Sequence, residues 1–118
     1  MENSRPYKLI PHPVRNAMKR TWYLILLAVG GGATHGRAIR DRVAELSDGE
    51  VQLWPTSLYG ALRELLAAGY LQEAAPDTEE DARRRGYELT PTGREAVHEG
   101  TRRIEALAAR AREITDAV

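Results

Sequence analysis

The chain has no cysteine, no long hydrophobic run and no excess of charge of either sign. Without cysteine, disulfide frameworks, thiolate metal sites and cysteine nucleophiles are all excluded. The longest apolar stretch, Trp22 to Val29, is far too short to span a bilayer. The first residues also lack the basic-then-apolar layout of a signal peptide. We therefore expect a cytoplasmic protein with no membrane partner.

Residues that could carry enzymatic chemistry are sparse as well. The three histidines, His12, His35 and His98, lie far apart, and no two of them have metal-ligand spacing. The sequence contains no nucleophile elbow, phosphate-binding glycine loop or dinucleotide-binding fingerprint. We therefore predict that the chain is not an enzyme and has neither catalytic residues nor a metal site nor a cofactor.

The net charge is zero, with 17 basic and 17 acidic residues, but the charges are unevenly distributed. Residues 1–42 contain eight Lys or Arg and two Asp or Glu, a net charge of +6, so the rest of the chain sums to −6. A basic first third is compatible with a DNA-facing surface and equally compatible with solvated helix faces.

Hydrophobic periodicity predicts an irregular arm followed by two helices. Residues 1–13 contain three prolines and form the arm. The apolar residues of 14–29 lie on one helical stripe that broadens toward its end, which indicates burial on more than one side. A glycine run at 30–32 should end this helix. The next helix, with Thr34 as its N-cap, has three inward-facing residues: Ile39, Val43 and Leu46.

A short strand and a third helix are expected next. Residues Val51 to Leu53 read as the strand, and Pro55 suits the first position of the helix. Trp54, directly before it, is expected to anchor that helix. The inward side of the helix consists of apolar residues at helical spacing: Leu58, Leu62 and Leu65.

A hairpin and a long helix complete the chain. Tyr70 to Ala75 and Gly86 to Leu89 are strand-like and flank a charged tip. Thr90 and Pro91 are typical of the N-cap and first turn of a last helix, which should run to about Thr115. Its apolar positions form a heptad seam: Val97, Gly100, Ile104, Leu107, Ala111, Ile114 and Val118. Such a seam predicts a homodimer, although it could also lie on its own domain.

This order of elements is that of a winged helix-turn-helix protein, mainly α with a small β-hairpin, plus a long C-terminal dimerisation helix. We expect an N-terminal arm at 1–13, a winged-helix DNA-binding domain at 14–90 and the dimerisation helix at 91–118. In this plan the third helix enters the major groove, and the hairpin touches the adjacent backbone or minor groove.

Three motifs in the stretch 26–94 resemble the PadR family of bacterial transcriptional regulators. They are His35-Gly36, the segment EVQLWPTSLYGAL at 50–62, and the segment RGYELTPTGR at 85–94. The resemblance implies a winged-helix repressor of the short form, which dimerises through a single C-terminal helix. It also implies binding to an inverted repeat in a promoter and release by a small aromatic or drug-like molecule.

The predicted contacts with double-stranded DNA come from the third helix and the hairpin. Helical geometry turns the non-leucine side of the third helix outward, where Arg63 could read guanine and the hydroxyl groups could bind phosphates. The hairpin arginines would add phosphate or minor-groove contacts. The candidate residues are Thr56, Ser57, Tyr59, Gly60, Arg63, Arg83, Arg84, Arg85 and Tyr87.

Two alternatives stay open at this stage. Met18 and Trp22 are candidates for an effector pocket at the dimer interface, but residues of this kind more often belong to a core. The rival function is a winged-helix module for protein–protein interaction without specific DNA binding, in which the surface helix and arginine-rich loop are simply solvated. The zero net charge slightly favours that rival.

Overall fold

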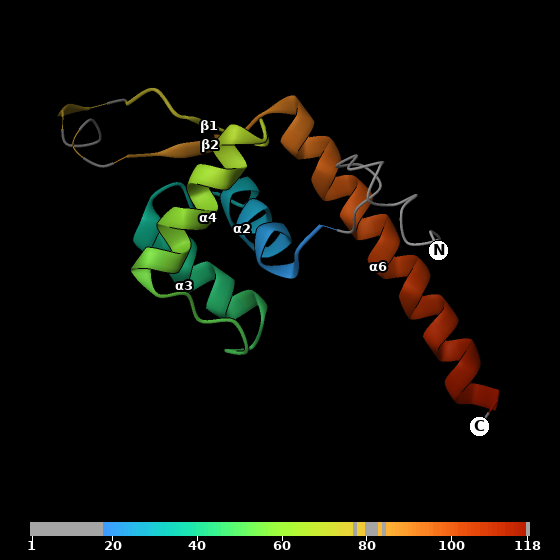
Figure 1. The fold of residues 1–118 in the computed structure, drawn as a ribbon. Helices are drawn as coiled ribbons and strands as arrows, with labels where there is room; N and C mark the ends of the chain where they lie inside the picture. The colour runs from blue at the N-terminus through green and yellow to red at the C-terminus, as the bar shows by residue number, and fades with distance from the viewer. Residues whose placement is uncertain (1–17, 77, 80–82, 84, 118) are drawn as a thin grey trace, which may run out of the picture.

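The computed structural model describes residues 18–76, 78–79, 83 and 85–117. Its elements in chain order are α2 (Arg20–Gly30), α3 (Gly36–Leu46), α4 (Pro55–Ala67), β1 (Leu71–Glu73), β2 (Tyr87–Leu89) and α6 (Pro91–Ala117). Helices α2, α3 and α4 gather into a compact body from which the hairpin and α6 extend in different directions (Figure 1). The chain is thus mainly helical with a small hairpin, and the predicted fold class is confirmed.

Helix α2 lies at the centre of the body and packs against α3, β2 and α6. The predicted burial on several sides is confirmed, because five of the six residues from 24 to 29 are buried: Leu24, Ile25, Leu26, Ala28 and Val29. The first residues of the predicted helix, 14–17, lie outside the described residues, as does the predicted arm; Met18 and Lys19 are described but precede the helix, which begins later than predicted, at Arg20. Helix α2 ends at the glycine run, where Gly32 has a φ of +111°.

Helix α3 differs from the prediction at both ends. Its N-cap is His35 rather than Thr34, and the His35 carbonyl accepts the amide of Ile39 at 2.9 Å. Ile39 and Val43 are fully buried, but Leu46 is 40% exposed, so its assignment to the inward side is wrong. The reason is the turn that follows, in which Ser47 takes the buried position and its hydroxyl donates to the Val43 carbonyl at 2.9 Å.

The predicted strand at 51–53 is wrong, since these residues form a non-regular segment. Side-chain hydrogen bonds replace a strand partner. Ser47 Oγ accepts the amide of Val51 at 2.9 Å, and Arg40 Nε donates to the Leu53 carbonyl at 3.0 Å. The side chains of Val51 and Leu53 are partly buried against the core, so the apolar alternation is explained without a sheet.

Helix α4 begins at Pro55 as predicted, and Leu58, Leu62 and Leu65 are 0–1% exposed. It ends at Ala67, and in the turn that follows the φ of +82° at Gly69 allows the amide of Tyr70 to return to the Leu65 carbonyl at 3.0 Å. This left-handed glycine turns the chain sharply into β1.

The hairpin is antiparallel, with Leu71 opposite Leu89 and Glu73 opposite Tyr87. Its strands are shorter than predicted, but the loop before α3 extends the sheet at one point. The amide of Tyr87 donates to the Thr34 carbonyl at 2.9 Å, and His35 forms a β-bridge with Gly86. The base of the hairpin is therefore attached to the start of α3.

Helix α6 starts with the predicted Thr90 cap, whose Oγ1 accepts the amide of Gly93 at 2.9 Å. A Cβ atom at Gly93 would lie 2.0 Å from the carbonyl oxygen of Tyr70, so glycine is required where the helix crosses the α4–β1 turn. The helix then runs out of the body as a straight rod (Figure 1). Among the described helices, none is both long enough and apolar enough to cross a membrane.

Candidate nucleic-acid interface

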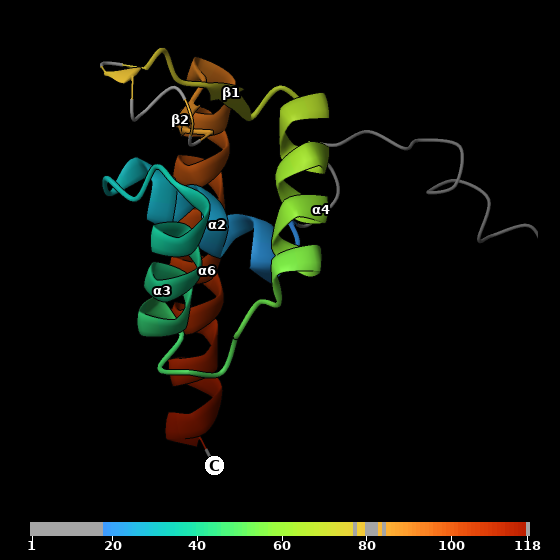
Figure 2. The same cartoon turned by 90° about the vertical axis from the view of Figure 1, so that its left-hand side faces the viewer.

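The outward side of α4 carries the side chains predicted to meet DNA. Thr56, Ser57, Tyr59 and Arg63 are exposed, whereas the leucines on the opposite side are buried. Seen from the side opposite α6, α3 and α4 stand next to each other in front, with α6 behind (Figure 2). The hairpin tip also projects on this side (Figure 1). We call the outward side of α4, together with the hairpin that follows it, the α4 face.

Tyr59 links α4 to the start of α3. A Cβ atom at Gly36 would lie 2.6 Å from the Tyr59 hydroxyl oxygen and 3.2 Å from the adjacent ring carbon. Any larger residue at position 36 would therefore push the ring away. The His35-Gly36 motif and the Leu-Tyr motif of α4 meet at this contact, and Tyr59 remains 46% exposed at the surface.

Gly60 and Arg63 are neighbours on the α4 face. A Cβ atom at Gly60 would be 3.9 Å from Nη2 of Arg63, so the guanidinium lies back along the helix over the glycine. The absence of a side chain at position 60 leaves space beside an exposed cation. Within residues 51–63, Arg63 is the only charged residue of the sequence, and no carboxylate opposes an approaching polyanion there.

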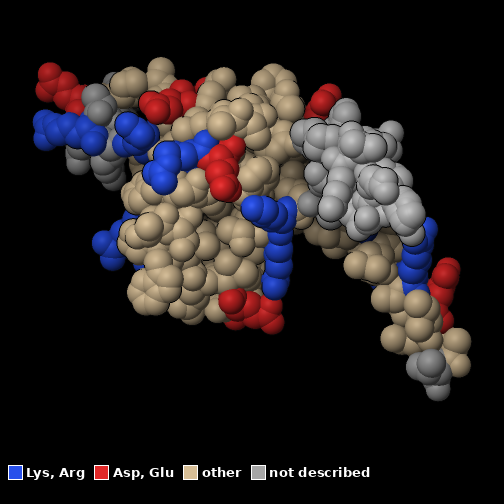
Figure 3. All heavy atoms as spheres, viewed as in Figure 1, with Lys and Arg blue, Asp and Glu red and all other residues tan. Residues whose placement is uncertain are grey.

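The hairpin provides two of its three predicted arginines within the described residues. Arg83 and Arg85 are exposed, while Arg84 lies outside the described part of the chain. Arg85 Nε is 3.6 Å from a carboxylate oxygen of Glu73, and the Arg85 carbonyl contacts His35 Nδ1 at 3.3 Å. Arginine side chains lie along the hairpin, with Asp and Glu side chains among them (Figure 3). The hairpin is therefore of mixed charge.

Tyr87 does not belong to this surface, and its prediction as a DNA contact is wrong. Only 2% of the residue is exposed, because β2 turns its side chain into the core beside Leu71. Burial raises the pKa of the Tyr87 phenol above its usual value of 10.0, against a smaller opposing effect of Arg85. The residue stabilises the base of the hairpin instead.

Trp54 departs from its prediction in the opposite direction. It was expected to anchor α4, but 76% of the residue is exposed. The signal that could have revealed this is the alternation of the preceding segment, in which Val51 and Leu53 face inward while Gln52 and Trp54 face outward. Sequence reasoning thus missed a large exposed aromatic side chain directly before the helix of the α4 face.

The predicted dimerisation seam of α6 divides into two parts. Val97 is half-buried against the core, and Gly100 packs on the ring of Tyr23, where a Cβ atom would be only 2.9 Å from a ring carbon. The Tyr23 hydroxyl and Thr101 Oγ1 are hydrogen-bonded at 2.7 Å beside this crossing. The remaining apolar positions are exposed to solvent: Ile104 at 52%, Leu107 at 68%, Ile114 at 64%, and Ala111. Val118 lies outside the described residues.

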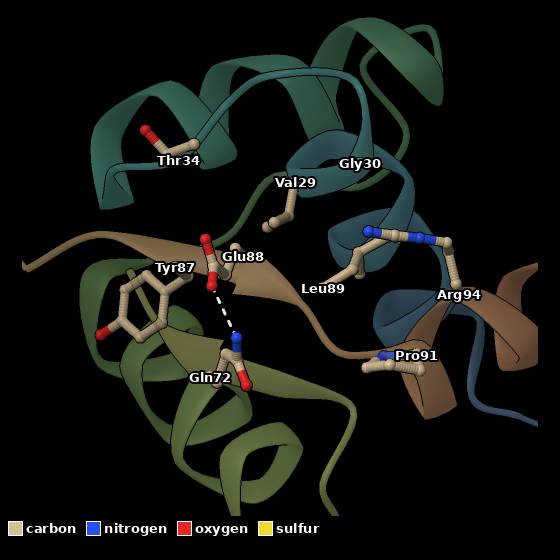
Figure 4. A pocket seen from close by; sticks show the side chains of 9 residues that line it. All are labelled: Val29, Gly30, Thr34, Gln72, Tyr87, Glu88, Leu89, Pro91 and Arg94. Atoms are coloured by element: carbon tan, nitrogen blue, oxygen red, sulfur yellow. Dashed lines mark hydrogen bonds between the residues drawn. The ribbon is translucent and has the colours of Figure 1, made fainter. Parts of the chain in front are cut away.

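Met18 and Trp22 are partly buried and pack against the core. Trp22 meets the ring of Tyr70 edge-on at 6.1 Å and donates its indole N–H to Glu64 of α4 at 3.3 Å. A shallow hollow of about 600 Å³ occurs elsewhere, between the end of α2, the hairpin and the start of α6 (Figure 4). Its wall includes Arg94 and the hydrogen-bonded pair Gln72 and Glu88. Among the described residues, no three His, Asp or Glu side chains gather as metal ligands would.

Comparison with known proteins identifies the family. Residues 25–99 match the transcriptional regulator PadR-like family. A PadR family transcription regulator from Clostridium difficile R20291 has a similar structure, with a TM-score of 0.67, 17% identity, and coverage of 82% of this chain and 99% of that chain. A transcriptional regulator from Clostridium thermocellum gives a TM-score of 0.63 at 22% identity, with 79% and 87% covered. These two likenesses establish the fold.

An uncharacterized 37.1 kDa protein in transposon TN4556 of Streptomyces fradiae is 36% identical over 87 residues. The matched region is 74% of this chain but 24% of that protein, so the chain spans about a quarter of its length. The match to the family covers the winged-helix body and the start of α6, which contain all three motifs of the sequence. The chain therefore belongs to the PadR-like family, whose members are transcriptional regulators and not enzymes.

Proposed function

We propose that the chain is a homodimeric repressor that binds an inverted-repeat promoter site through the α4 face and is released by a small molecule. The observation that carries this proposal is the outward side of α4, where Thr56, Ser57, Tyr59 and Arg63 are exposed and uninterrupted by acidic residues. In a winged-helix protein this helix enters the major groove.

Each exposed residue of α4 has a distinct role in the proposal. Arg63 is suited to donate to the O6 and N7 atoms of guanine, because its guanidinium can form two parallel hydrogen bonds. Thr56 and Ser57, in the first turn, donate to phosphates and fix the register of the helix. Tyr59 sets the position of α4 against α3 through Gly36 and presents its remaining exposed edge to the sugar–phosphate backbone.

The hairpin extends the contact to the flanking backbone. Arg83 and Arg85 would bind phosphates or enter the minor groove, and each such contact steepens the dependence of affinity on salt. Glu73 holds Arg85 in an exposed ion pair, which is weak enough to exchange for a phosphate contact. Arg84 remains part of the predicted cluster.

Dimerisation is supported by the exposed part of the α6 seam. Three large aliphatic side chains in a row are between 52% and 68% exposed: Ile104, Leu107 and Ile114. Their heptad spacing, with Ala111 between them, matches the interface of a helix pair. A twofold dimer places two copies of α4 on the same side of the DNA, which is why an inverted repeat is expected.

The proposal includes a small-molecule effector. Release by a small aromatic or drug-like molecule is implied by the resemblance to the family. Met18 and Trp22 stay the predicted pocket residues, and both are partly buried against the core. Titration of the purified protein with such compounds, followed by Trp22 fluorescence and by loss of DNA binding, tests this part separately.

The experiment that tests the proposal is selection of genomic DNA fragments by the purified protein, with footprinting of the most enriched one. We expect two protected half-sites of opposite orientation, about one helical turn apart. Arg63→Ala should then weaken binding to the selected site more than to random DNA, by about 1–3 kcal/mol. No enrichment at low salt would contradict the DNA-binding proposal and favour the protein-interaction alternative.

A further inference from the structure

Trp54 is the most exposed large apolar side chain among the described residues, at 76%. Tryptophan is usually well covered, because its large apolar surface gains most from leaving water. Here the residue directly precedes Pro55, the first residue of α4. Because tryptophan combines a large apolar ring with an N–H donor, it is enriched at binding interfaces, and Trp54 lies next to the helix proposed to bind DNA.

The backbone that carries Trp54 is held firmly from both sides. Before it, Leu53 is partly buried and its carbonyl accepts Arg40 Nε at 3.0 Å. After it, Pro55 fixes the backbone into the first turn, and the Trp54 carbonyl accepts the amide of Leu58 at 2.9 Å. Because inward and outward positions alternate along this extended segment, the burial of Leu53 forces Trp54 outward.

The chemistry around Trp54 favours a nucleic acid over a protein as its partner. Its neighbours Gln52, Thr56 and Ser57 are exposed and polar, so the indole stands alone instead of joining an apolar patch of the size that protein interfaces require. No acidic residue occurs between Glu50 and Glu64, and Glu50 itself is paired with Arg20 at 2.9 Å. A polyanion can therefore approach without repulsion from this segment.

We propose that Trp54 is a DNA contact of this regulator, in addition to the outward residues of α4. The ring packs on a deoxyribose or on a thymine methyl group at the edge of the major groove, and the indole N–H donates to a phosphate oxygen. This inference rests on the proposed function, since it places Trp54 at the entrance of the groove that α4 occupies.

The test uses the full chain and the DNA site selected by the wild-type protein. Trp54→Ala should weaken binding to that site about tenfold or more, as expected for loss of an aromatic contact with a nucleotide. Leu46→Ala is the matched control, because it removes another exposed apolar side chain of the same body, at the end of α3, and should leave affinity unchanged. Circular dichroism and thermal melts establish that both variants fold.

A second measurement follows the indole itself. The chain has two tryptophans, so Trp22→Phe leaves Trp54 as the sole tryptophan, which can be excited at wavelengths where the tyrosines do not absorb. Quenching by acrylamide should be strong in the free protein and should fall when the selected duplex is added. If Trp22→Phe does not fold, the difference between wild-type and Trp54→Phe spectra gives the same information.

The outcomes separate this inference from the proposed function. Wild-type affinity of Trp54→Ala, with an indole that stays accessible in the complex, overturns the Trp54 contact and leaves the DNA-binding function intact. Shielding of Trp54 that follows protein concentration without DNA assigns the residue to a contact between copies and also overturns it. Failure of the wild-type protein to select any DNA overturns both proposals together.

Discussion

Helices α4 and α6 carry apolar stripes of similar helical spacing, but their surroundings differ. On α4 the stripe of Leu58, Leu62 and Leu65 is at most 1% exposed, because α2, α3 and the hairpin base cover it. On α6 only the beginning of the stripe, Val97 and Gly100, packs on the body, and Ile104 to Ile114 remain in solvent. The same periodicity therefore serves packing within the chain on α4, and on α6 it would serve packing against a second copy in the proposed dimer.

The largest expected effect comes from the covered stripe. Leu62→Ala should lower the free energy of unfolding by about 2–5 kcal/mol, because it leaves a cavity in a fully packed core. Ile114→Ala, the matched change on the open stripe, should alter unfolding of the monomer by less than about 0.5 kcal/mol. Urea denaturation below the dimerisation concentration measures both. Equal losses for the two variants would mean that the end of α6 folds back on the body.

The next effect concerns assembly. Ile104→Asp combined with Leu107→Asp should convert the dimer to a monomer, because two charges would have to be buried in the helix pair. Ala109→Asp lies at the outermost heptad position and should leave the dimer intact. Sedimentation equilibrium measures the mass, and circular dichroism verifies that the body stays folded. A dimer that survives the double change would remove the seam from the interface.

A third comparison involves two glycines of α6. Gly93→Ala should cost about 1–3 kcal/mol, since its Cβ would collide with the rigid backbone carbonyl of Tyr70. Gly100→Ala meets the side chain of Tyr23, which can shift, and alanine also improves helix propensity by up to about 1 kcal/mol. We expect Gly100→Ala to be nearly neutral in thermal denaturation. A larger loss for Gly100→Ala than for Gly93→Ala would contradict this ranking.

The smallest effect is a dependence of stability on alkaline pH. Burial raises the pKa of Tyr87 in the folded state above 10.0, so the folded state holds this proton more tightly than the unfolded state. The resulting stabilisation is fully present below pH 10.0 and is lost as the pH rises through the folded-state pKa. Tyr87→Phe should flatten the decline of stability in that range, measured by urea denaturation at a series of pH values. An unchanged decline would show that Tyr87 does not contribute to it.

The helical elements could be predicted well because their signals are local. Pro55 and Thr90 mark helix starts through backbone geometry and capping, and the leucine spacing of α4 gives its buried side directly. The family motifs add the order of the elements. The predictions for α4 required no knowledge of the rest of the chain.

The wrong predictions concern residues whose conformation or burial is determined by contacts with distant parts of the chain. The segment 51–53 has the alternation of a strand, but Ser47 and Arg40 satisfy its backbone, so no strand partner is needed. Tyr87 was predicted to contact DNA together with the hairpin arginines, yet its amide pairs with the Thr34 carbonyl and its ring is buried. Trp54 was predicted to anchor α4 because it directly precedes that helix, yet it is exposed. Each case depends on tertiary contacts that periodicity does not encode.

The joint at the start of α6 has a mechanical consequence. Thr90 Oγ1 donates to the Gly69 carbonyl at the end of α4, and Gly93 lies directly on the next residue, Tyr70. The first turn of the 27-residue helix α6 is thus attached to the turn that directly follows α4. A tilt of a few degrees at this joint displaces the far end of a rod about 40 Å long by several ångström. Conversely, if two α6 helices pair in the proposed dimer, their packing fixes the distance and the angle between the two α4 helices. Helix α6 would then control the geometry of the DNA-binding helices as well as assembly.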